Sequence, residues 1–402
     1  MQTLHQRFSV PFGYPVHFSA GILDPQNPLL ADTLAGDPAS SGSAARRARF
    51  LPVIDEGLLA HHPDLPARLA AYAKAHGERV RMSGAPITVP GGEAAKNDPA
   101  LLTLLQRAVQ EHRLCRHSYL VAIGGGAVID LVGYAAATAH RGIRLVRIPT
   151  TVLAQNDAAI GVKNGVNAFG AKNFLGTFAP PHAVLNDPDF LGTLSDRDWR
   201  SGISEAVKVA LVKDPAFFDR IESDAPLVAP PRRDPEAMGR MIHRCAQLHL
   251  EHIAEGGDPF EMGSSRPLDF GHWAAHRLEH LTAYGLRHGE AVAVGIALDT
   301  VYSELSGLLD RPSCDRVLDL LHACGFDLFV PEMALHLDDP DHPDSLFQGI
   351  REFREHLGGR LTVMLLEAIG RGVEVHEVEP ERYREAVEHL RDRVTATPGA
   401  GR

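Results

Sequence analysis

The first half of the chain alternates short apolar runs with amphipathic stretches. The runs at 51–55, 80–82, 119–123 and 145–148 predict buried β-strands, and the pattern over 65–76 predicts an amphipathic helix. Strands that alternate with helices are typical of a parallel sheet with helices packed on its faces. We therefore predict an α/β domain over residues 1–195.

Longer helical periods dominate after residue 195. The apolar positions predict helices over 200–212, 235–254, 272–281 and 290–305, then a late strand over 361–366 and a charged helix over 379–394. This pattern predicts a second, mainly α-helical domain over residues 196–402.

Composition narrows the choice of partners. The 402 residues suffice for two domains, and 44% hydrophobic with 23% charged residues is ordinary for a soluble globular protein. The formal charge of −11 argues against binding to nucleic acid or anionic membranes, so an anionic substrate needs a local basic pocket. The four cysteines form no CxxC pair, and no apolar run approaches the length of a membrane span. We predict a cytoplasmic protein without nucleic-acid or membrane partners.

Three histidines lie close together in the segments DFGHWAAH and HGE, namely His272, His276 and His288. In a helix, His272 and His276 leave the same face one turn apart. Imidazole binds zinc and related metals and also transfers protons near neutral pH, so the cluster indicates a metal site, a proton-transfer site or both. Glu205, on a predicted helix, is a candidate third ligand that leaves a coordination position open for substrate. The alternatives are chance grouping among 22 histidines and a glutamate that faces water.

Two kinds of segment favour phosphate groups. Gly124, Gly125 and Gly126 follow a predicted strand and lead into a helix, so backbone amides and the helix N-terminus can approach an anion. The segment does not match the GxGxxG fingerprint, and a tight strand-to-helix turn is the alternative. The polar stretch 149–173 holds Lys163 and Lys172 among glycines and asparagines, a composition that suits phosphate oxygens or a solvated loop.

Together these segments resemble the 3-dehydroquinate synthase family of sugar phosphate cyclases. The resemblance spans residues 50–370 and rests on GGGAVID, HRGIRLVRIPTT, DAAIGVKNGVNAFGAKNFLG, SEAVK, DFGHWAAH and HGEAVAVGI, in that order. It implies an NAD-binding α/β domain, followed by a mainly α-helical metal-binding and substrate-binding domain.

The resemblance also implies roles for individual residues. Glu205, His272 and His288 match the family's metal ligands, with zinc or cobalt expected, and His276 matches a histidine that assists proton movement around the reacting phosphate. The matches to NAD contacts are Asp55, Glu93, Lys96, Gly124, Gly125, Gly126, Asp130, Thr150, Thr151, Asp157 and Lys172. The matches to the substrate region are Asp157, Lys163, Asn173, Lys208, Arg266 and Asp269, with Arg141 reaching a phosphate across the interface of an expected homodimer.

The implied reaction is that of a carbon–oxygen lyase acting on a small sugar phosphate. NAD oxidises a ring hydroxyl, phosphate leaves by β-elimination, and NADH then returns the hydride. Ring opening and an intramolecular aldol reaction close a carbocycle. The cofactor carries the redox chemistry, while the protein orients the substrate and the metal polarises it.

The chain departs from the family pattern, so we expect a divergent member. Asp269 stands in place of an asparagine, His249 in place of a lysine, and FREH at 353–356 in place of a late double lysine. Such changes alter anion recognition. A heptulosonate 7-phosphate is the slightly favoured substrate because Arg266 is retained. The alternative is another sugar phosphate, such as sedoheptulose 7-phosphate, because related cyclases that use this substrate without a carboxylate vary in the same region.

Two other classes of protein share this architecture. One is a metal-dependent polyol dehydrogenase, against which the lysine-containing stretch 163–173 and the Glu-His-His set argue. The other is a catalytically silent binding protein that keeps the fold.

Overall fold

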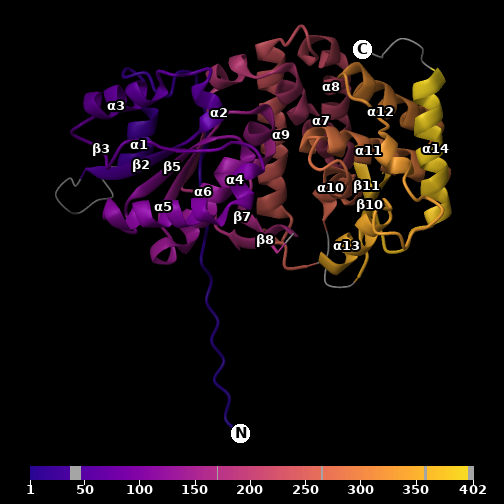
Figure 1. Cartoon of the computed structure of the whole chain (residues 1–402), viewed down its shortest axis with the longest axis horizontal. Coiled ribbons are helices and arrows are strands. Elements are labelled where there is room, and N and C mark those ends of the chain that lie inside the picture. The colour runs from indigo at the N-terminus through magenta and orange to yellow at the C-terminus, as the bar shows by residue number, and fades with distance from the viewer. Residues whose placement is uncertain (37–46, 170, 264–265, 357–359, 397–402) are drawn as a thin grey trace. The chain divides into compact units, whose positions relative to one another are not determined.

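The computed structural model describes residues 1–36, 47–169, 171–263, 266–356 and 360–396 (Figure 1). The chain forms two compact units. The first consists of Met1–Thr150 and Gly161–Asp189, and the second of Thr151–Ile160 and Phe190–Arg402.

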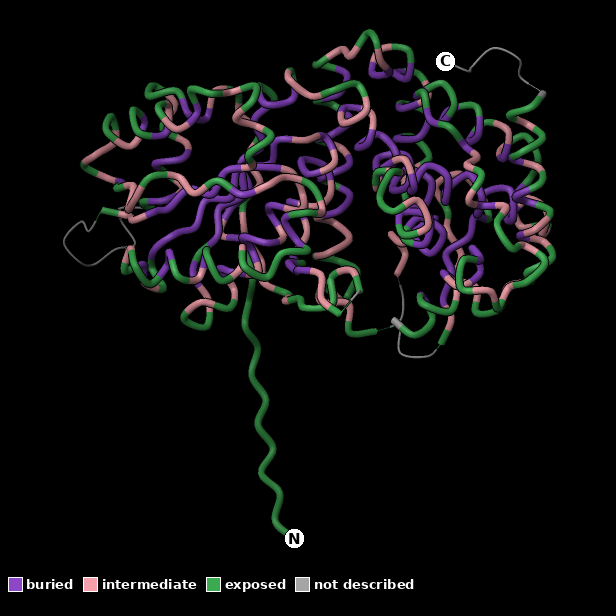
Figure 2. The backbone as a smooth tube through the Cα atoms, in the orientation of Figure 1, coloured by how far each residue is buried: buried purple, intermediate pink, exposed green. Residues whose placement is uncertain are grey.

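The first unit is built on a parallel sheet of seven strands. The strand order is β1-β9-β6-β5-β2-β3, and β4 also pairs with β2. The strands are β1 (Val16–Phe18), β2 (Ala48–Asp55), β3 (Val80–Met82), β4 (Ile87–Val89), β5 (Tyr119–Gly124), β6 (Arg144–Pro149) and β9 (Ala183–Asn186). Every pairing among them is parallel, which confirms the predicted sheet type. The middle strands are almost wholly buried, as their continuous apolar runs require (Figure 2).

Helices cover both faces of this sheet. They are α1 (Leu29–Ala35), α2 (Glu56–Leu59), α3 (Leu65–Ala75), α4 (Ala94–Asn97), α5 (Pro99–Glu111) and α6 (Gly126–Thr138), followed by the 3₁₀ turn η2 (Ala139–Arg141). Figure 1 shows α3 on one side of the sheet and α5 and α6 on the other. The start of α5 follows its sequence closely, because the Asp98 side chain accepts from the Ala100 amide at 2.8 Å and Pro99 occupies the first helical position.

The polar stretch after β6 forms an antiparallel hairpin of β7 (Lys163–Ala168) and β8 (Ala171–Phe178). The buried guanidinium of Arg147 anchors this hairpin by donating to the Gly161 carbonyl at 2.6 Å and to Asn164 Oδ1 at 2.7 Å. Helix α6 approaches so closely that a Cβ on Gly133 would lie 1.8 Å from Asn164 Oδ1. Part of the stretch 149–173, for which the sequence predicts either phosphate binding or a solvated loop, is therefore an anchored hairpin.

The second unit is mainly helical, as predicted. Its helices are α7 (Asp196–Lys213), α8 (Pro215–Val228), α9 (Pro235–Glu255), α10 (His272–Leu281), α11 (His288–Leu305), α12 (Arg311–Ala323), α13 (Gln348–His356) and α14 (Pro380–Ala396). Its strands are β10 (Val363–Ala368) and β11 (Arg371–Val375). Its short helical turns are η3 (Ala154–Ala158), η5 (Pro267–Asp269) and η6 (Pro331–Ala334). The division of the chain between Asp189 and Phe190 falls within the turn η4 (Pro188–Thr193). Within the described part of the chain, no helix has both the length and the apolar content to cross a membrane.

The division differs from the predicted boundary at 195/196. Residues 151–160 belong to the second unit, because Asn156 Nδ2 donates to the Gly202 carbonyl in α7 at 2.7 Å. A Cβ on Gly202 would lie 2.4 Å from Val152 Cγ1 and 2.5 Å from the Leu153 amide nitrogen. Only a glycine in α7 allows this close approach, and nothing in the pattern of 151–160 indicates it.

Candidate active site

Three predicted metal ligands from separate helices meet in the second unit. Glu205 lies within α7, while His272 and His288 are the first residues of α10 and α11. Glu205 Oε1 is 3.8 Å from His272 Nε2 and 3.7 Å from His288 Nε2, and one ligand atom from each residue lies within 4.8 Å of the others. Tetrahedral zinc with bonds of about 2.1 Å separates its ligand atoms by about 3.4 Å, so small side-chain movements would close this set around one ion.

The charge states of these residues fit a divalent cation. Glu205 is fully buried, and burial raises the pKa of its carboxyl although Lys208 opposes the change. Burial, reinforced by Lys208, holds the pKa of His272 well below its usual value. His272 is therefore a neutral imidazole, the form that donates a lone pair to a metal. A buried carboxylate beside a neutral imidazole is stabilised by a bound cation.

Lys208 is the cation that accompanies Glu205. It lies one turn further along α7 and forms an ion pair with the Glu205 carboxylate. Burial lowers the pKa of Lys208, but Glu205, Asp157 and Asp269 outweigh burial and raise it. Lys208 is therefore charged and surrounded by three acids.

A second carboxylate orients one of the imidazoles. Glu279, buried on α10, places Oε2 3.3 Å from His288 Nδ1, so it can hold the ring with Nε2 directed toward Glu205. His276 is exposed, and its ring centroid lies 5.4 Å from that of His272 and 5.9 Å from that of His288. It is thus beside the ligand cluster and open to solvent, as its predicted proton-transfer role requires.

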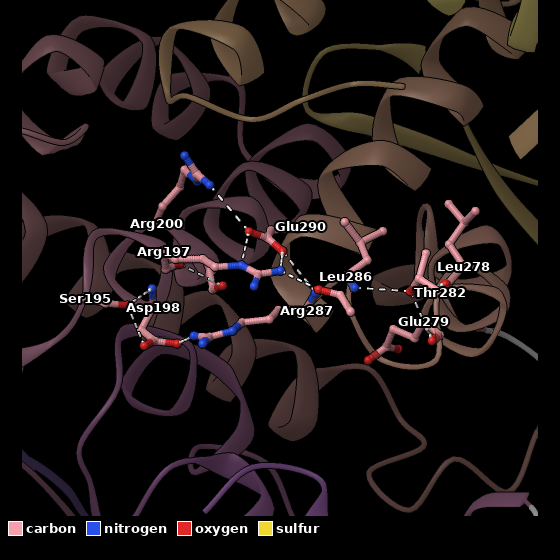
Figure 3. A network of polar contacts seen from close by, with 12 residues as sticks. Ser195, Arg197, Asp198, Arg200, Leu278, Glu279, Thr282, Leu286, Arg287 and Glu290 are labelled. Atoms are coloured by element: carbon pink, nitrogen blue, oxygen red, sulfur yellow. Dashed lines mark hydrogen bonds and ion pairs between the residues drawn. The ribbon is translucent and has the colours of Figure 1, made fainter. Parts of the chain in front are cut away.

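A network around Glu290 fixes the segment that leads into His288 (Figure 3). Its carboxylate accepts from Arg197 Nε at 2.6 Å and from the Arg287 amide at 3.0 Å, with Arg200 at 3.4 Å. Arg197 also donates to the Gly285 carbonyl at 2.6 Å. Because Arg197 and Arg200 belong to α7, the network joins the helix of Glu205 to the first turn of the helix of His288.

The predicted substrate residues of this unit are already paired with acids or carbonyls. His249 Nε2 lies 3.5 Å from Asp157 Oδ1, and His249 is buried. Arg266 Nε is 3.3 Å from Glu261 Oε2, and its guanidinium also donates to the carbonyls of Gly263 and Glu261. Asp269 lies close enough to Lys208 to raise the pKa of that amine.

The predicted cofactor residues of the first unit gather at the carboxyl ends of the strands. Asp55 ends β2, Gly124 ends β5, and the Thr150 amide, just after β6, donates to the Gly124 carbonyl at 3.0 Å. From β2 the chain passes first to β3 and β4 on one side and then to β5 on the other, so the strand order reverses between β2 and β5. Open parallel sheets bind ligands at such a switch point.

Glycines let the backbone pack closely against Asp55 at this edge. A Cβ on Gly91 would lie 2.4 Å from Asp55 Oδ1, and one on Gly124 would lie 2.9 Å from the Asp55 Cβ. Gly125 caps α6, so the amides of the first turn point toward the switch point.

A polar network links further predicted residues beside the hairpin. Lys96, which is buried, donates to Asp130 Oδ2 at 2.9 Å and contacts Asn173 Oδ1. Lys172 Nζ lies 3.6 Å from Glu93 Oε1, and Asn167 bridges Glu93 and the Asn173 amide. The network thus joins residues predicted for the cofactor to one predicted for the substrate.

Three further predicted residues lie on other segments of the two units. Lys163 is exposed at the start of β7, Arg141 is exposed in η2, and the Thr151 hydroxyl accepts from the Ala154 amide at the start of the turn η3 in the second unit. Their roles stay predictions. Sequence reasoning missed Glu279 and Glu290, although Glu279 lies three residues after His276 on the same helix, a spacing that could have suggested it.

Known proteins match this chain along most of its length. The family model described as 3-dehydroquinate synthase N-terminal matches residues 86–201, and that described as 3-dehydroquinate synthase C-terminal matches 202–340. A 3-dehydroquinate synthase from Nitrosospira multiformis is 36% identical over 369 residues, covering 92% of each chain. A 2-epi-5-epi-valiolone synthase from Streptomyces glaucescens is 34% identical over 370 residues, covering 91% of this chain and 87% of that protein.

A solved structure matches the fold of both units. It is the 2-epi-5-epi-valiolone synthase of Streptomyces hygroscopicus subsp. jinggangensis 5008, described with NAD+ and Zn2+ bound. It is 31% identical, with a TM-score of 0.84, and the match covers 97% of this chain and 100% of that one. Fold and relatives thus define an enzyme of the sugar phosphate cyclase class. The chain belongs to the 3-dehydroquinate synthase family, which confirms the predicted family and fold class.

Proposed function

We propose that this enzyme is an NAD+- and metal-dependent cyclase whose substrate is a ketoheptose 7-phosphate without a carboxylate, of the sedoheptulose 7-phosphate type. The group of Glu205, His272 and His288, of which the first two are buried, is the observation that carries the chemistry. The acidic surroundings of Lys208 support the choice of substrate. This choice departs from the heptulosonate 7-phosphate that the sequence slightly favours.

The metal and the nucleotide would each have a defined place. Glu205, His272 and His288 would hold a divalent metal, with Glu279 orienting the ring of His288. Asp55, the Gly124 turn and the start of α6 would hold NAD+. When bound, NAD+ supplies a reversible hydride acceptor and the metal supplies a Lewis acid.

Other side chains would bind the substrate and move protons. Lys208 would hydrogen-bond a substrate hydroxyl beside the metal ligands and stabilise negative charge that develops on its oxygen. The exposed imidazole of His276 would carry a proton to or from the leaving phosphate. Lys163 and Asn173 would contact the substrate, as the family resemblance implies.

The charge distribution favours a substrate without a carboxylate. Such an acid group would need cations, but Lys208 already faces three carboxylates and Arg266 is paired with Glu261. The residue at 269 adds a negative charge where a neutral amide would add none. An unpaired carboxylate brought into these surroundings would meet repulsion and lose hydration.

Phosphate release tests this substrate directly. The purified protein is incubated with NAD+, Zn2+ or Co2+, and either sedoheptulose 7-phosphate or the heptulosonate 7-phosphate. We expect catalytic phosphate release and a carbocyclic product only with sedoheptulose 7-phosphate. Release from the heptulosonate compound alone would overturn the proposed substrate, and net NADH accumulation with a simple polyol would favour a dehydrogenase.

A heptulosonate 7-phosphate is the second candidate, because the cation Arg266 is retained. If Arg266 leaves Glu261 to bind a substrate carboxylate, Arg266→Met should abolish phosphate release from that compound. The Glu261→Gln variant should instead increase it by removing the competing acid.

We also propose that the enzyme is a cytoplasmic homodimer. All four cysteines are free thiols, as a reducing compartment favours. Light scattering coupled to size-exclusion chromatography measures the mass, and a monomeric mass would contradict the dimer.

A further inference from the structure

Asp299 is a buried carboxylate with no part in the proposed chemistry. It lies within α11, is 0% exposed, and accepts three hydrogen bonds. Gly271 N–H donates to Oδ2 at 3.1 Å, while Trp273 Nε1 and the Tyr383 hydroxyl donate to Oδ1 at 3.0 and 2.8 Å. Burial raises the pKa of Asp299 to about 7, although these three donors lower it. A group this costly to bury invites a specific explanation.

Two of the three donors stand on either side of His272. Gly271 has a φ of +78° and a backbone packed directly on α11, since a Cβ there would lie 2.6 Å from the Ile296 nitrogen. The approach is mutual, because a Cβ on Gly295 would lie 2.0 Å from the Gly271 oxygen. Asp299 therefore holds the turn before His272 and the side chain after it against one point of α11.

The third donor brings in the C-terminal helix. Tyr383 is a buried residue of α14, its ring stacks on Tyr302 at 4.0 Å, and it meets the Trp273 ring edge-on at 4.9 Å. The Tyr302 hydroxyl in turn accepts from the Glu379 amide at 2.9 Å. Tyr383 of α14 and the start of α10 are thus both bonded to Asp299 of α11.

We propose that Asp299 is a positioning residue that sets where the His272 imidazole lies. The effect on metal binding rests on the proposed function. The effect on the position of His272 does not.

Asp299→Asn is the decisive variant, because the new side chain has one acceptor atom for three donors. In Asp299→Asn, the amide oxygen will face the two donors Trp273 and Tyr383, which leaves the NH2 group against the Gly271 N–H. This removes the acceptor of Gly271 with little change of volume. Tyr383→Phe is the matched control, because it removes one donor to Oδ1 and leaves the bond to Gly271 intact.

The test is NMR spectroscopy of the full chain with isotope-labelled histidine. The ring signals of His272 are assigned by their loss in His272→Gln and are then compared in the metal-free wild type, D299N and Y383F. We expect them to shift in D299N and to stay in place in Y383F, even if both variants lower the unfolding temperature. With Co2+ bound, D299N should change the visible absorption spectrum and weaken metal affinity about tenfold, while Y383F should do neither.

Each outcome of these measurements supports or overturns the proposal. Unshifted His272 signals in folded D299N overturn the proposal, and so does an equal shift in Y383F. If D299N does not fold, Trp273→Phe replaces it, and unshifted His272 signals there overturn the proposal. A wild type that binds no Co2+ overturns the proposed metal role, while the metal-free signals still test Asp299.

Discussion

The first unit gathers its candidate cofactor residues at the ends of parallel strands, whereas the second gathers its candidate metal ligands from three helices. At the strand ends, the glycine turn and backbone amides form much of the candidate site, and the pair of Lys172 and Glu93 remains partly exposed. In the second unit Glu205 is fully buried, and the charges of Lys208, Asp157 and His288 act on its carboxyl. One site is shaped mainly by backbone, and the other by buried side chains.

This difference predicts how each site responds to substitution. A buried charge cannot recruit water when its partner is lost, so one atom changed in the second unit has a large effect. A partly exposed ion pair in the first unit is screened and replaced by water at small cost. Substitution effects should therefore fall steeply from the buried cluster to the strand ends, and a reversed order would contradict the comparison.

The largest effect is expected for Glu205→Gln. The amide is nearly isosteric but carries no charge, so a divalent ion loses its only anionic ligand in the set of Glu205, His272 and His288. A Lewis acid stabilises a transition state by several kcal/mol, and about 1.4 kcal/mol is tenfold in rate, so phosphate release should fall about 1,000-fold. Bound zinc, measured by elemental analysis after dialysis, should fall with it. Lost activity with full zinc occupancy would mean that Glu205 acts other than as a ligand.

A smaller effect is expected for Glu279→Gln, because Glu279 orients a candidate metal ligand and is not a ligand itself. The carboxylate lies 3.3 Å from His288 Nδ1, and loss of such a partner weakens metal affinity about 10- to 100-fold. Competition with a coloured chelator measures the affinity. The exposed His280→Ala on the same helix is the control and should change nothing. Equal affinity in Glu279→Gln and wild type would show that His288 needs no carboxylate to orient it.

The same contrast separates what the sequence could predict from what it could not. The strand ends were predictable because apolar runs, glycines and flanking polar residues are contiguous, and parallel strands bring their ends together. The three helix ligands were nominated through family motifs, and the structure brings them together from positions 205, 272 and 288. Packing of 151–160 against Gly202, the hydrogen bonds of Asp299 and the Glu290 network depend on tertiary contacts, which no local pattern encodes.

At the strand ends, Gly91→Ala is expected to have a moderate effect. The new Cβ would lie 2.4 Å from Asp55 Oδ1, and Asp55 cannot turn away without losing its bond to the Gly57 amide at 2.9 Å. Overpacking costs about 1–3 kcal/mol, so NAD+ affinity measured by calorimetry should fall roughly tenfold. Gly161→Ala, where a Cβ meets nothing within 4 Å, is the control and should bind normally. Equal binding by both variants would remove Asp55 from the cofactor site.

The smallest effect is expected for Lys172→Gln, which tests the exposed end of the comparison. Lys172 Nζ lies 3.6 Å from Glu93 Oε1, with 21% and 27% of the two side chains exposed, so the pair should contribute less than about 1 kcal/mol to stability. If Lys172 also attracts the pyrophosphate of NAD+, affinity should fall a few-fold, and less so at high salt. Glu93→Gln shows whether Glu93 competes with NAD+ for Lys172, because removal of the competing acid should then strengthen NAD+ binding. Weakening in both variants would instead identify Glu93 as the residue that contacts the cofactor. A loss as large as that of Glu205→Gln would contradict the contrast between a backbone-built and a side-chain-built site.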